Sequence, residues 1–370
     1  MSEAAGETPG SSGLRKRGGV DGIQKKNPFD DDSSASSLND NKLIPPAKWT
    51  FNKKGFPQAI AHRGYKAEYP ENTMGAFRGA VDVGAHAIET DVHLSKDNVV
   101  VIAHDKDLKR CYGVEGLVRD HDWSYLSTLR TLREPRQPMP RLSDLLAYLA
   151  EPANASVWLL LDIKVDDAAE EMIPLLAATI HRAAQSLSSS SSSSNSNNWS
   201  SRIVLGCWTA RHVRLCHELL PDFAIAWIGI TLALAREYLA VPNIALNMRQ
   251  EPMRYGFGGR KFIQEVQADG RPLYAWTVNS VAWMRWAIGK RLDAVITDDP
   301  RLFLEVCKRY GEEEARGGAV DKGVGGLVAT AQGFLLTLAL PLLLKYAISG
   351  LGYYKRVGSP EETREVLRKL

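Results

Sequence analysis

Residues 157–163 read VWLLLDI, an apolar run of strand length without alternation of polar and apolar positions. A strand that is apolar on both faces is typical of a parallel sheet covered by helices on both sides. Seven more short apolar runs of this kind follow one another along the chain. They lie at 59–62, 86–92, 203–208, 224–230, 244–248, 273–278 and 294–297.

Segments with a helical spacing of apolar residues lie between these runs. They span 73–83, 142–150, 168–187, 210–220, 232–239, 261–268, 281–288 and 301–308. Eight strand-then-helix units predict an α/β fold, a closed (β/α)8 or TIM barrel over residues 57–310. The alternative is an open doubly wound sheet. A glycine-rich phosphate loop after the first run would favour that alternative, and the sequence has none there.

Side chains suited to catalysis stand at or near the ends of several predicted strands, where barrel enzymes place their chemistry. These residues are His62, Glu89, Asp91, Asp162, Lys164 and Trp276. Glu89 and Asp91 are two positions apart, so on a strand their side chains share a face and can bind one cation together. His62 and His104 carry imidazoles that can take up or release a proton near neutral pH. This set of groups is what phosphodiester hydrolysis requires.

Short motifs around these residues carry a resemblance to a known family. They are AHRG at 61–64, PENT at 70–73, ETD at 89–91, AHD at 103–105, LDIK at 161–164, AWTVN at 275–279 and AVITDDP at 294–300. In this order they resemble the glycerophosphodiester phosphodiesterase family, and most closely its fungal phosphatidylglycerol phospholipase C branch. The resemblance runs from about Gln58 to Pro300. It implies a barrel enzyme that hydrolyses phosphoric diesters.

A divalent cation is expected at the acidic residues. Histidine acid–base catalysis contributes on the order of 10² to 10⁴ in rate per group, far less than phosphate ester hydrolysis needs. A cation held by Glu89, Asp91 and Asp162 would neutralise the charge that develops on the phosphoryl oxygens, and all-oxygen ligands favour Mg²⁺ or Ca²⁺. By the resemblance the third ligand is usually a glutamate, so Asp162 departs from the family pattern. The resemblance also implies that His62 and His104 share the roles of base and acid, with His104 the better candidate to protonate the leaving alkoxide.

Four further residues are predicted to bind the substrate or its phosphate. Arg63 would act through its planar guanidinium and Lys164 as a point charge, with an ion pair on the barrel rim as the alternative for both. Glu71 and Asn72 resemble the family's substrate-proximal loop after the first strand. Asn72 or Thr73 can equally be the N-cap of the helix that follows, and the sequence leaves both roles open.

The reaction implied by the resemblance is metal-assisted cleavage of phosphatidylglycerol, which yields diacylglycerol and glycerol phosphate. Trp276 is expected either to form an apolar wall beside the glycerol unit or to belong to the barrel core. One alternative is that the same site cleaves water-soluble, deacylated glycerophosphodiesters. Another is an inactive membrane-bound barrel that senses lipid, but the intact His62, Glu89, Asp91 and His104 argue against it.

Charge and cysteine usage narrow the partners and the compartment. The 370 residues include 46 basic and 43 acidic side chains, and the net charge of +3 is too small to indicate a nucleic-acid partner. Four cysteines, Cys111, Cys207, Cys216 and Cys307, have no CxxC or zinc-type spacing. We therefore expect buried, reduced thiols in a protein that faces the cytosol.

Three segments interrupt the repeat of strands and helices. Residues 99–104 read as an extra strand that pairs back through a turn at 96–98. The long connection 106–140 corresponds to the small inserted subdomain of the family. A low-complexity insertion rich in serine and asparagine spans 186–198 and should be solvated.

The two ends of the chain are predicted to lie outside the barrel. Residues 1–47 are rich in Gly, Ser, Asp and Lys and should form a disordered tail. After the barrel, 311–326 reads as a flexible tether, 327–348 as a hydrophobic membrane anchor and 349–370 as a basic tail. An amphipathic helix packed on the barrel is the alternative for the anchor. We expect an intracellular membrane location through this anchor, with the barrel facing the cytosol and a phospholipid as substrate.

Overall fold

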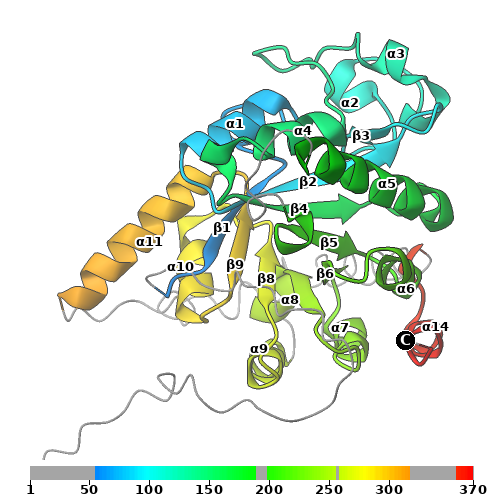
Figure 1. Cartoon of the computed structure of the whole chain (residues 1–370). Helices are drawn as coiled ribbons and strands as arrows, with labels where there is room; N and C mark the ends of the chain where they lie inside the picture. The colour runs from blue at the N-terminus through cyan, green and yellow to red at the C-terminus, as the bar shows by residue number, and fades with distance from the viewer. Residues whose placement is uncertain (1–54, 189–197, 256–257, 317–355, 370) are drawn as a thin grey trace, which may run out of the picture. The chain divides into compact units, whose positions relative to one another are not determined.

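The structure is a computed structural model that describes residues 55–188, 198–255, 258–316 and 356–369 (Figure 1). Its centre is a closed barrel of eight parallel strands in the order β1-β2-β4-β5-β6-β7-β8-β9, with β9 paired to β1. The strands are β1 Gln58–His62, β2 Ala87–Leu94, β4 Trp158–Ile163, β5 Ile203–Cys207, β6 Ala224–Gly229, β7 Ala245–Arg249, β8 Leu273–Trp276 and β9 Ala294–Thr297. All eight predicted strand regions are present, so the predicted (β/α)8 barrel is confirmed.

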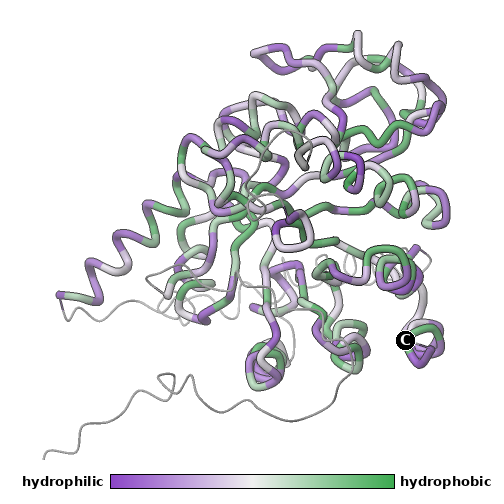
Figure 2. Tube along the Cα trace, in the orientation of Figure 1, coloured by the Kyte–Doolittle hydropathy of each residue, from purple (hydrophilic) through white to green (hydrophobic). Residues whose placement is uncertain are grey.

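Side chains along each strand alternate between two hydrophobic layers. On β5, Val204 belongs to the cluster inside the barrel, whereas Ile203 and Leu205 belong to the cluster between strands and helices. Because both layers are apolar, the strands have unbroken apolar sequences. Figure 2 shows the strands as mainly hydrophobic stretches and the helices as alternating hydrophobic and hydrophilic residues. At the N-terminal end of the barrel interior, Trp158 Nε1 donates to Gln58 Oε1 at 2.8 Å.

Helices lie between the strands along the chain and cover the outside of the barrel (Figure 1). They are α1 Met74–Asp82, α4 Leu142–Leu149, α5 Ala169–Ser188, α6 Ala210–Leu219, α7 Leu232–Tyr238, α8 Gln250–Tyr255, α9 Gly259–Ala268, α10 Val281–Gly289 and α11 Pro300–Ala315, with 3-10 helices at Pro152–Asn154 and Trp199–Ser201. Five of them begin at a side chain that caps the first turn. These N-caps are Thr73, Thr209, Thr231, Ser280 and Asp299. The chain therefore turns back along the barrel soon after the strand end that precedes each cap.

The inserted subdomain, residues 106–140, follows the extra strand predicted in the sequence. This strand is β3, Val100–Ile102, which pairs antiparallel with the end of β2. The subdomain contains α2 (Lys109–Tyr112), a 3-10 helix at Val118–Asp120 and α3 (Trp123–Leu126). A small hydrophobic cluster separate from the two barrel layers holds it together. It follows the carboxyl end of β3 in the chain and lies beside β3 (Figure 1).

The last described segment is a short helix, α14 (Pro360–Leu367), that packs beside α6 and α7. Arg364 Nε lies 2.8 Å from Glu237 Oε2 on α7, and Val357 and Leu367 are buried. The described part of the predicted basic tail therefore includes a helix held against the barrel.

The predicted intracellular membrane location is contradicted and we withdraw it. No helix in the described ranges is long and apolar enough to cross a membrane. The longest of them, α5, has 20 residues but carries the charged side chains of Glu170, Glu171 and Arg182. The predicted anchor at 327–348 lies outside the described residues. So do the predicted tail at 1–47 and most of the Ser/Asn insertion, whose first residues 186–188 end α5. The tether was predicted at 311–326, but its residues 311–315 continue α11, and the part from 317 onward lies outside the described residues.

A buried carboxyl group links β8 to β9 and should make stability depend on pH. Asp293 is 7% exposed, and its Oδ2 accepts from Leu273 N at 2.8 Å. Burial raises the pKa of Asp293 to about 7, although the hydrogen bond from the Leu273 amide acts in the opposite direction. Between pH 4 and 7 the folded state therefore holds a proton that the unfolded state has lost, so stability falls as the pH rises through this range.

We expect Asp293→Asn to stabilise the fold increasingly as the pH rises. The amide oxygen still accepts from Leu273, but no charge has to be buried. The melting temperature should exceed that of the wild type most at pH 8, by the equivalent of about 2 kcal/mol, and should match it near pH 4. Asp222→Asn, at an exposed loop position, is the matched control. If the melting temperatures of Asp293→Asn and wild type differ by the same amount at every pH, the raised pKa of Asp293 is contradicted.

Candidate active site

Three buried carboxylates meet at the carboxyl ends of β2 and β4. Glu89 and Asp91 lie on β2, Asp162 lies on β4, and Asp91 and Asp162 are register partners across the two strands. One carboxylate oxygen of each residue lies within 4.8 Å of those of the other two. The alternation of side chains along a strand explains this convergence, because Glu89 and Asp91 both face the barrel interior.

The charges of this cluster are strongly coupled. Burial and the neighbouring carboxylates of Asp91 and Asp162 raise the pKa of Glu89 well above its ordinary value. Lys164 Nζ lies 2.6 Å from Asp91 Oδ1 and 2.7 Å from Asp162 Oδ2. Burial disfavours the charge on Lys164, but the two aspartates raise its pKa above the ordinary value. Asp91 is accordingly held ionised, with its pKa lowered by Lys164 and Arg63 against the effect of burial.

The donor set fits a divalent cation. Six carboxylates and four cationic side chains make up the charged groups of the site. They are Glu71, Glu89, Asp91, Asp105, Asp162 and Asp298, with Arg63, Lys66, Arg110 and Lys164. With all six carboxylates ionised, Glu89 included, and the imidazoles neutral, six negative charges face four positive ones, and one divalent ion would neutralise the excess. Glu89, Asp91 and Asp162 would hold this ion, and it would supply charge stabilisation at the phosphoryl oxygens.

His62, at the end of β1, is paired with a carboxylate that the sequence analysis did not assign. Its Nδ1–H donates to Asp298 Oδ1 at 2.5 Å, and Asn279 Nδ2 donates to Asp298 Oδ2 at 2.8 Å. The carboxylate fixes the proton on Nδ1, so Nε2 is left for chemistry. Burial lowers the pKa of His62, and the hydrogen bond to Asp298 opposes this effect. His62 is therefore neutral at pH 7.

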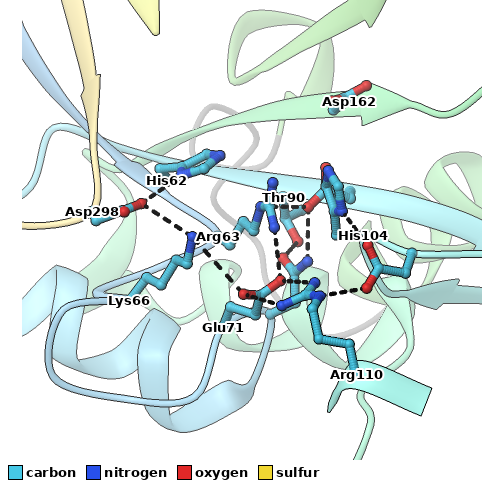
Figure 3. A network of polar contacts seen from close by, with 12 residues as sticks. His62, Arg63, Lys66, Glu71, Thr90, His104, Arg110, Asp162 and Asp298 are labelled. Atoms are coloured by element: carbon cyan, nitrogen blue, oxygen red, sulfur yellow. Dashed lines mark hydrogen bonds and ion pairs between the residues drawn. The ribbon is translucent and has the colours of Figure 1, made fainter. Parts of the chain in front are cut away.

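His104 has a similar arrangement on the other side of the site. Its Nδ1–H donates to Asp105 Oδ1 at 2.7 Å, and Arg110 Nε donates to Asp105 Oδ2 at 2.5 Å. Burial lowers the pKa of His104, while the charge of Asp91 acts in the opposite direction. Figure 3 shows His62 and His104 on opposite sides of Arg63. Two imidazoles with free Nε2 atoms thus flank the region next to the carboxylates.

The turn after β1 needs an unusual backbone. Arg63 and Gly64 have φ angles of 57° and 81°, and a Cβ on Gly64 would lie 2.7 Å from the backbone carbon of Ala76. Only glycine allows so close an approach to α1 in this conformation. The turn directs Arg63 N to Glu89 Oε2 at 2.9 Å, and Arg63 Nε lies 3.4 Å from Asp91 Oδ2.

The predicted phosphate contacts make ion pairs within the site. Arg63 Nη1 donates to Glu71 Oε1 at 2.8 Å, and Lys164 sits between two aspartates as described above. The ion-pair alternative is thus what the structure describes for both residues, and their contact with phosphate stays a prediction. Asn72 Nδ2 donates to Asp91 Oδ2 at 2.8 Å, so Asn72 holds a carboxylate of the cluster. The N-cap of α1 is Thr73, whose Oγ1 accepts from Ala76 N.

Two tryptophans form an apolar wall beside Asp162. Trp276 packs against the hydrophobic cluster inside the barrel, and its Nε1 donates to Asn247 O at 3.0 Å. Its ring meets that of Trp208 edge-on, with centroids 5.8 Å apart. Trp208 Nε1 donates to Asp162 Oδ1 at 2.6 Å. Trp276 therefore packs on the barrel core and borders the site, and its place beside a glycerol unit stays a prediction.

The sequence analysis did not identify several residues that the structure places in the site. Asp105 and Asp298 stand inside the quoted motifs, directly after His104 and at the end of the last strand run, so their positions were a usable signal. Trp208 ends the fourth main strand run and gave a weaker signal. Arg110 lies in the inserted subdomain, and no local pattern marks it.

A closed barrel with a buried carboxylate cluster and two carboxylate-paired histidines at the carboxyl ends of its strands defines a barrel hydrolase suited to metal-assisted cleavage of phosphoric esters. The model of the glycerophosphoryl diester phosphodiesterase family matches residues 62–302, and the chain belongs to this family. It is therefore a phosphoric diester hydrolase, and the expected enzyme class is confirmed.

Individual relatives agree with the family. A probable glycerophosphodiester phosphodiesterase of Mycobacterium tuberculosis is 28% identical over 281 residues, which cover 71% of this chain and 95% of the relative. A putative glycerophosphoryl diester phosphodiesterase from Silicibacter pomeroyi has the same fold, with a TM-score of 0.61 and 19% identity over 72% of this chain and 98% of that one. A phosphodiesterase from Oleispira antarctica, solved with the product sn-glycerol-3-phosphate, has a TM-score of 0.56 and 21% identity over 69% and 98%. Closeness to fungal phosphatidylglycerol phospholipases C stays a prediction.

Proposed function

We propose that this protein hydrolyses water-soluble glycerophosphodiesters to glycerol phosphate and a free alcohol. Water attacks phosphorus, and the bond between phosphorus and the alcohol oxygen breaks. The observation that carries the proposal is the carboxylate cluster of Glu89, Asp91 and Asp162 together with two carboxylate-paired histidines that lie on opposite sides of Arg63. The glycerol phosphate bound by the Oleispira phosphodiesterase supports the same product class.

The two histidines would divide the proton transfers. Burial lowers the pKa of both imidazoles, so at pH 7 a neutral imidazole is available to accept a proton from the attacking water. We assign this base role to His62 and assign His104 to protonate the leaving alkoxide. Glu89, Asp91 and Asp162 would hold a Mg²⁺ or Ca²⁺ ion, and Trp276 with Trp208 would line the substrate side of the site.

The family relatives support the soluble substrate class better than phosphatidylglycerol. The relatives reported above carry the names of glycerophosphodiester phosphodiesterases, whereas the glycerol phosphate bound by the Oleispira phosphodiesterase is a product of either substrate class. Cleavage of phosphatidylglycerol to diacylglycerol is therefore the comparison reaction in the test below.

A substrate panel with and without chelator tests the proposal. We expect glycerophosphocholine and glycerophosphoglycerol to be cleaved to glycerol phosphate, with activity lost in EDTA and restored by Mg²⁺ or Ca²⁺. Vesicles of phosphatidylglycerol should give much slower turnover. His181→Ala, an exposed position on α5, should behave as wild type. The proposal would be contradicted if phosphatidylglycerol were cleaved and the soluble glycerophosphodiesters were not, or if full activity remained in EDTA.

A further inference from the structure

Arg110, on α2 of the inserted subdomain, holds two carboxylates of the site (Figure 3). Its Nη1 and Nη2 donate to Glu71 Oε2 and Oε1 at 2.9 and 2.7 Å. Its Nε donates to Asp105 Oδ2 at 2.5 Å. A guanidinium presents its donors in one rigid plane, so a side chain bound at both ends fixes where the two carboxylates lie relative to each other.

Asp105 transmits this constraint to His104. One oxygen of Asp105 accepts from Arg110, and the other accepts from His104 Nδ1 at 2.7 Å. The side chain of His104 is 33% exposed, so packing alone does not confine the ring. The direction in which its Nε2 points therefore depends on where Asp105 is held.

Glu71 gives Arg110 a fixed anchor on the loop between β1 and α1. Its side chain is only 10% exposed, and it also accepts from Arg63 Nη1 at 2.8 Å. Burial alone would raise the pKa of Glu71, but the hydrogen bonds and charges of Arg110 and Arg63 lower it to about 2. Glu71 therefore stays ionised throughout the neutral range, and Arg110 keeps its partner.

A second arginine of the inserted subdomain holds the same loop. Arg133 Nη1 donates to Tyr69 O at 2.7 Å and to Lys66 O, and its Nη2 donates to Ala67 O at 2.8 Å. The subdomain thus binds the β1–α1 loop in two places. Arg133 binds backbone carbonyl groups of the loop, and Arg110 binds the side chain of Glu71. The loop cannot shift relative to the subdomain without breaking both sets of contacts.

We propose that Arg110 is a positioning residue for the hydrolysis: anchored on Glu71, it holds Asp105 so that the His104 imidazole stays directed at the leaving group. This inference rests on the proposed function, because it requires His104 to take part in the reaction. Arg110 itself does not touch the reacting atoms. Its side chain is 49% exposed, and the subdomain has its own hydrophobic cluster. Loss of the guanidinium should therefore leave the fold intact.

The first test compares Arg110 with a matched arginine of the same subdomain. With glycerophosphocholine as substrate, Arg110→Ala should lower kcat by about 10- to 100-fold, the cost of a misplaced catalytic group. KM should change less than about threefold and the melting temperature should stay close to wild type. Arg110→Lys should recover only part of the loss, because one ammonium cannot hold both carboxylates in a plane. Arg136, which pairs with Glu134 inside the subdomain, is the control, and Arg136→Ala should keep full activity.

A double-mutant cycle with Asp105 separates positioning through Asp105 from other effects. If Arg110 acts through Asp105, the double variant Arg110→Ala with Asp105→Asn should be no slower than Asp105→Asn alone. The inference is overturned if the two losses multiply, or if Arg110→Ala equals Arg136→Ala. Should Arg110→Ala fail to fold, Arg110→Lys takes its place in the cycle. Failure of the wild type on soluble glycerophosphodiesters would instead contradict the proposed function, so the two failures are distinguishable.

Discussion

Glu89→Gln should lower kcat by about 10³-fold or more and weaken the binding of Mg²⁺ and Ca²⁺. Glutamine has the shape of glutamate, and its amide oxygen can still accept from Arg63 N, which lies 2.9 Å from Glu89 Oε2. The substitution therefore removes one negative charge and leaves the turn after β1 in place. A bound divalent cation supplies several kcal/mol of charge stabilisation to phosphoryl transfer, which corresponds to a loss of this size.

Cation binding can be measured apart from turnover. Trp208 Nε1 donates to Asp162 Oδ1 at 2.6 Å, so a cation bound by Asp162 should change tryptophan fluorescence. Titration of the wild type with Mg²⁺ or Ca²⁺ should give a saturable signal, and Glu89→Gln should shift it to higher concentration. Glu68→Gln, at an exposed position of the β1–α1 loop, removes the same charge outside the cluster and should titrate as wild type. An unchanged titration and unchanged kcat in Glu89→Gln would exclude a cation at the three carboxylates.

The barrel and the carboxylate cluster could be predicted because both follow from local signals. A parallel strand covered on both faces has an unbroken apolar sequence, and each of the eight runs carried that signal on its own. The carboxyl ends of neighbouring strands meet at one edge, so Asp91 and Asp162 needed only to end their runs to be brought together. Every barrel of this class brings together the residues that end neighbouring strands. The positions of the motifs along the sequence were therefore enough to predict the carboxylate cluster.

The partner of His62 and the contacts of Arg110 are a different matter, since they depend on contacts between distant segments. His62 and Asp298 lie 236 positions apart, and Arg110 and Glu71 lie 39 apart. Neither distance follows a periodicity, so sequence patterns do not pair these residues. Lys164 was predicted as a phosphate contact because it follows a strand end, yet two aspartates surround it. A cationic side chain at a strand end can serve either purpose, and only its neighbours decide which.

The predicted membrane location is contradicted by the described part of the chain. The prediction rested on the hydropathy of 327–348, which lie outside the described residues, whereas the described helices are amphipathic and bury their apolar faces on the barrel. None of these helices is apolar over a membrane-spanning length. The described helix α14 packs beside α6 and α7 and forms an ion pair with α7, a contact that the composition of the C-terminal segment did not indicate.

His104→Ala should lower kcat for glycerophosphocholine by about 10² to 10⁴, the range for loss of a general acid or base. The loss should shrink to less than about tenfold with a glycerophosphoryl p-nitrophenyl ester. A p-nitrophenolate leaves without a proton, so a variant that lacks only the acid is rescued by this leaving group. His62→Ala should be slow on both esters, because the nucleophile still lacks its base.

The pH dependence of kcat/KM is an independent test of the roles assigned to the two histidines. Burial lowers the pKa of His62 below the ordinary value of 6.5, and a base is active only when it is neutral. The acidic limb of kcat/KM in the wild type should therefore fall below pH 6.5, with activity lost as the pH falls through the pKa of the base. Asp298→Asn removes the carboxylate that raises this pKa, so it should move the acidic limb to still lower pH while it also lowers the rate.

Comparison of the two histidines decides whether the site divides its proton transfers in this way. If His104→Ala is equally slow on both esters and His62→Ala is rescued by the p-nitrophenyl ester, the assigned roles are reversed. If neither variant loses more than His181→Ala, the imidazoles take no part and hydrolysis must proceed by another group. We expect neither of these outcomes, because Asp298 and Asp105 accept from the Nδ1 of His62 and His104 and leave the Nε2 of each imidazole for proton transfer.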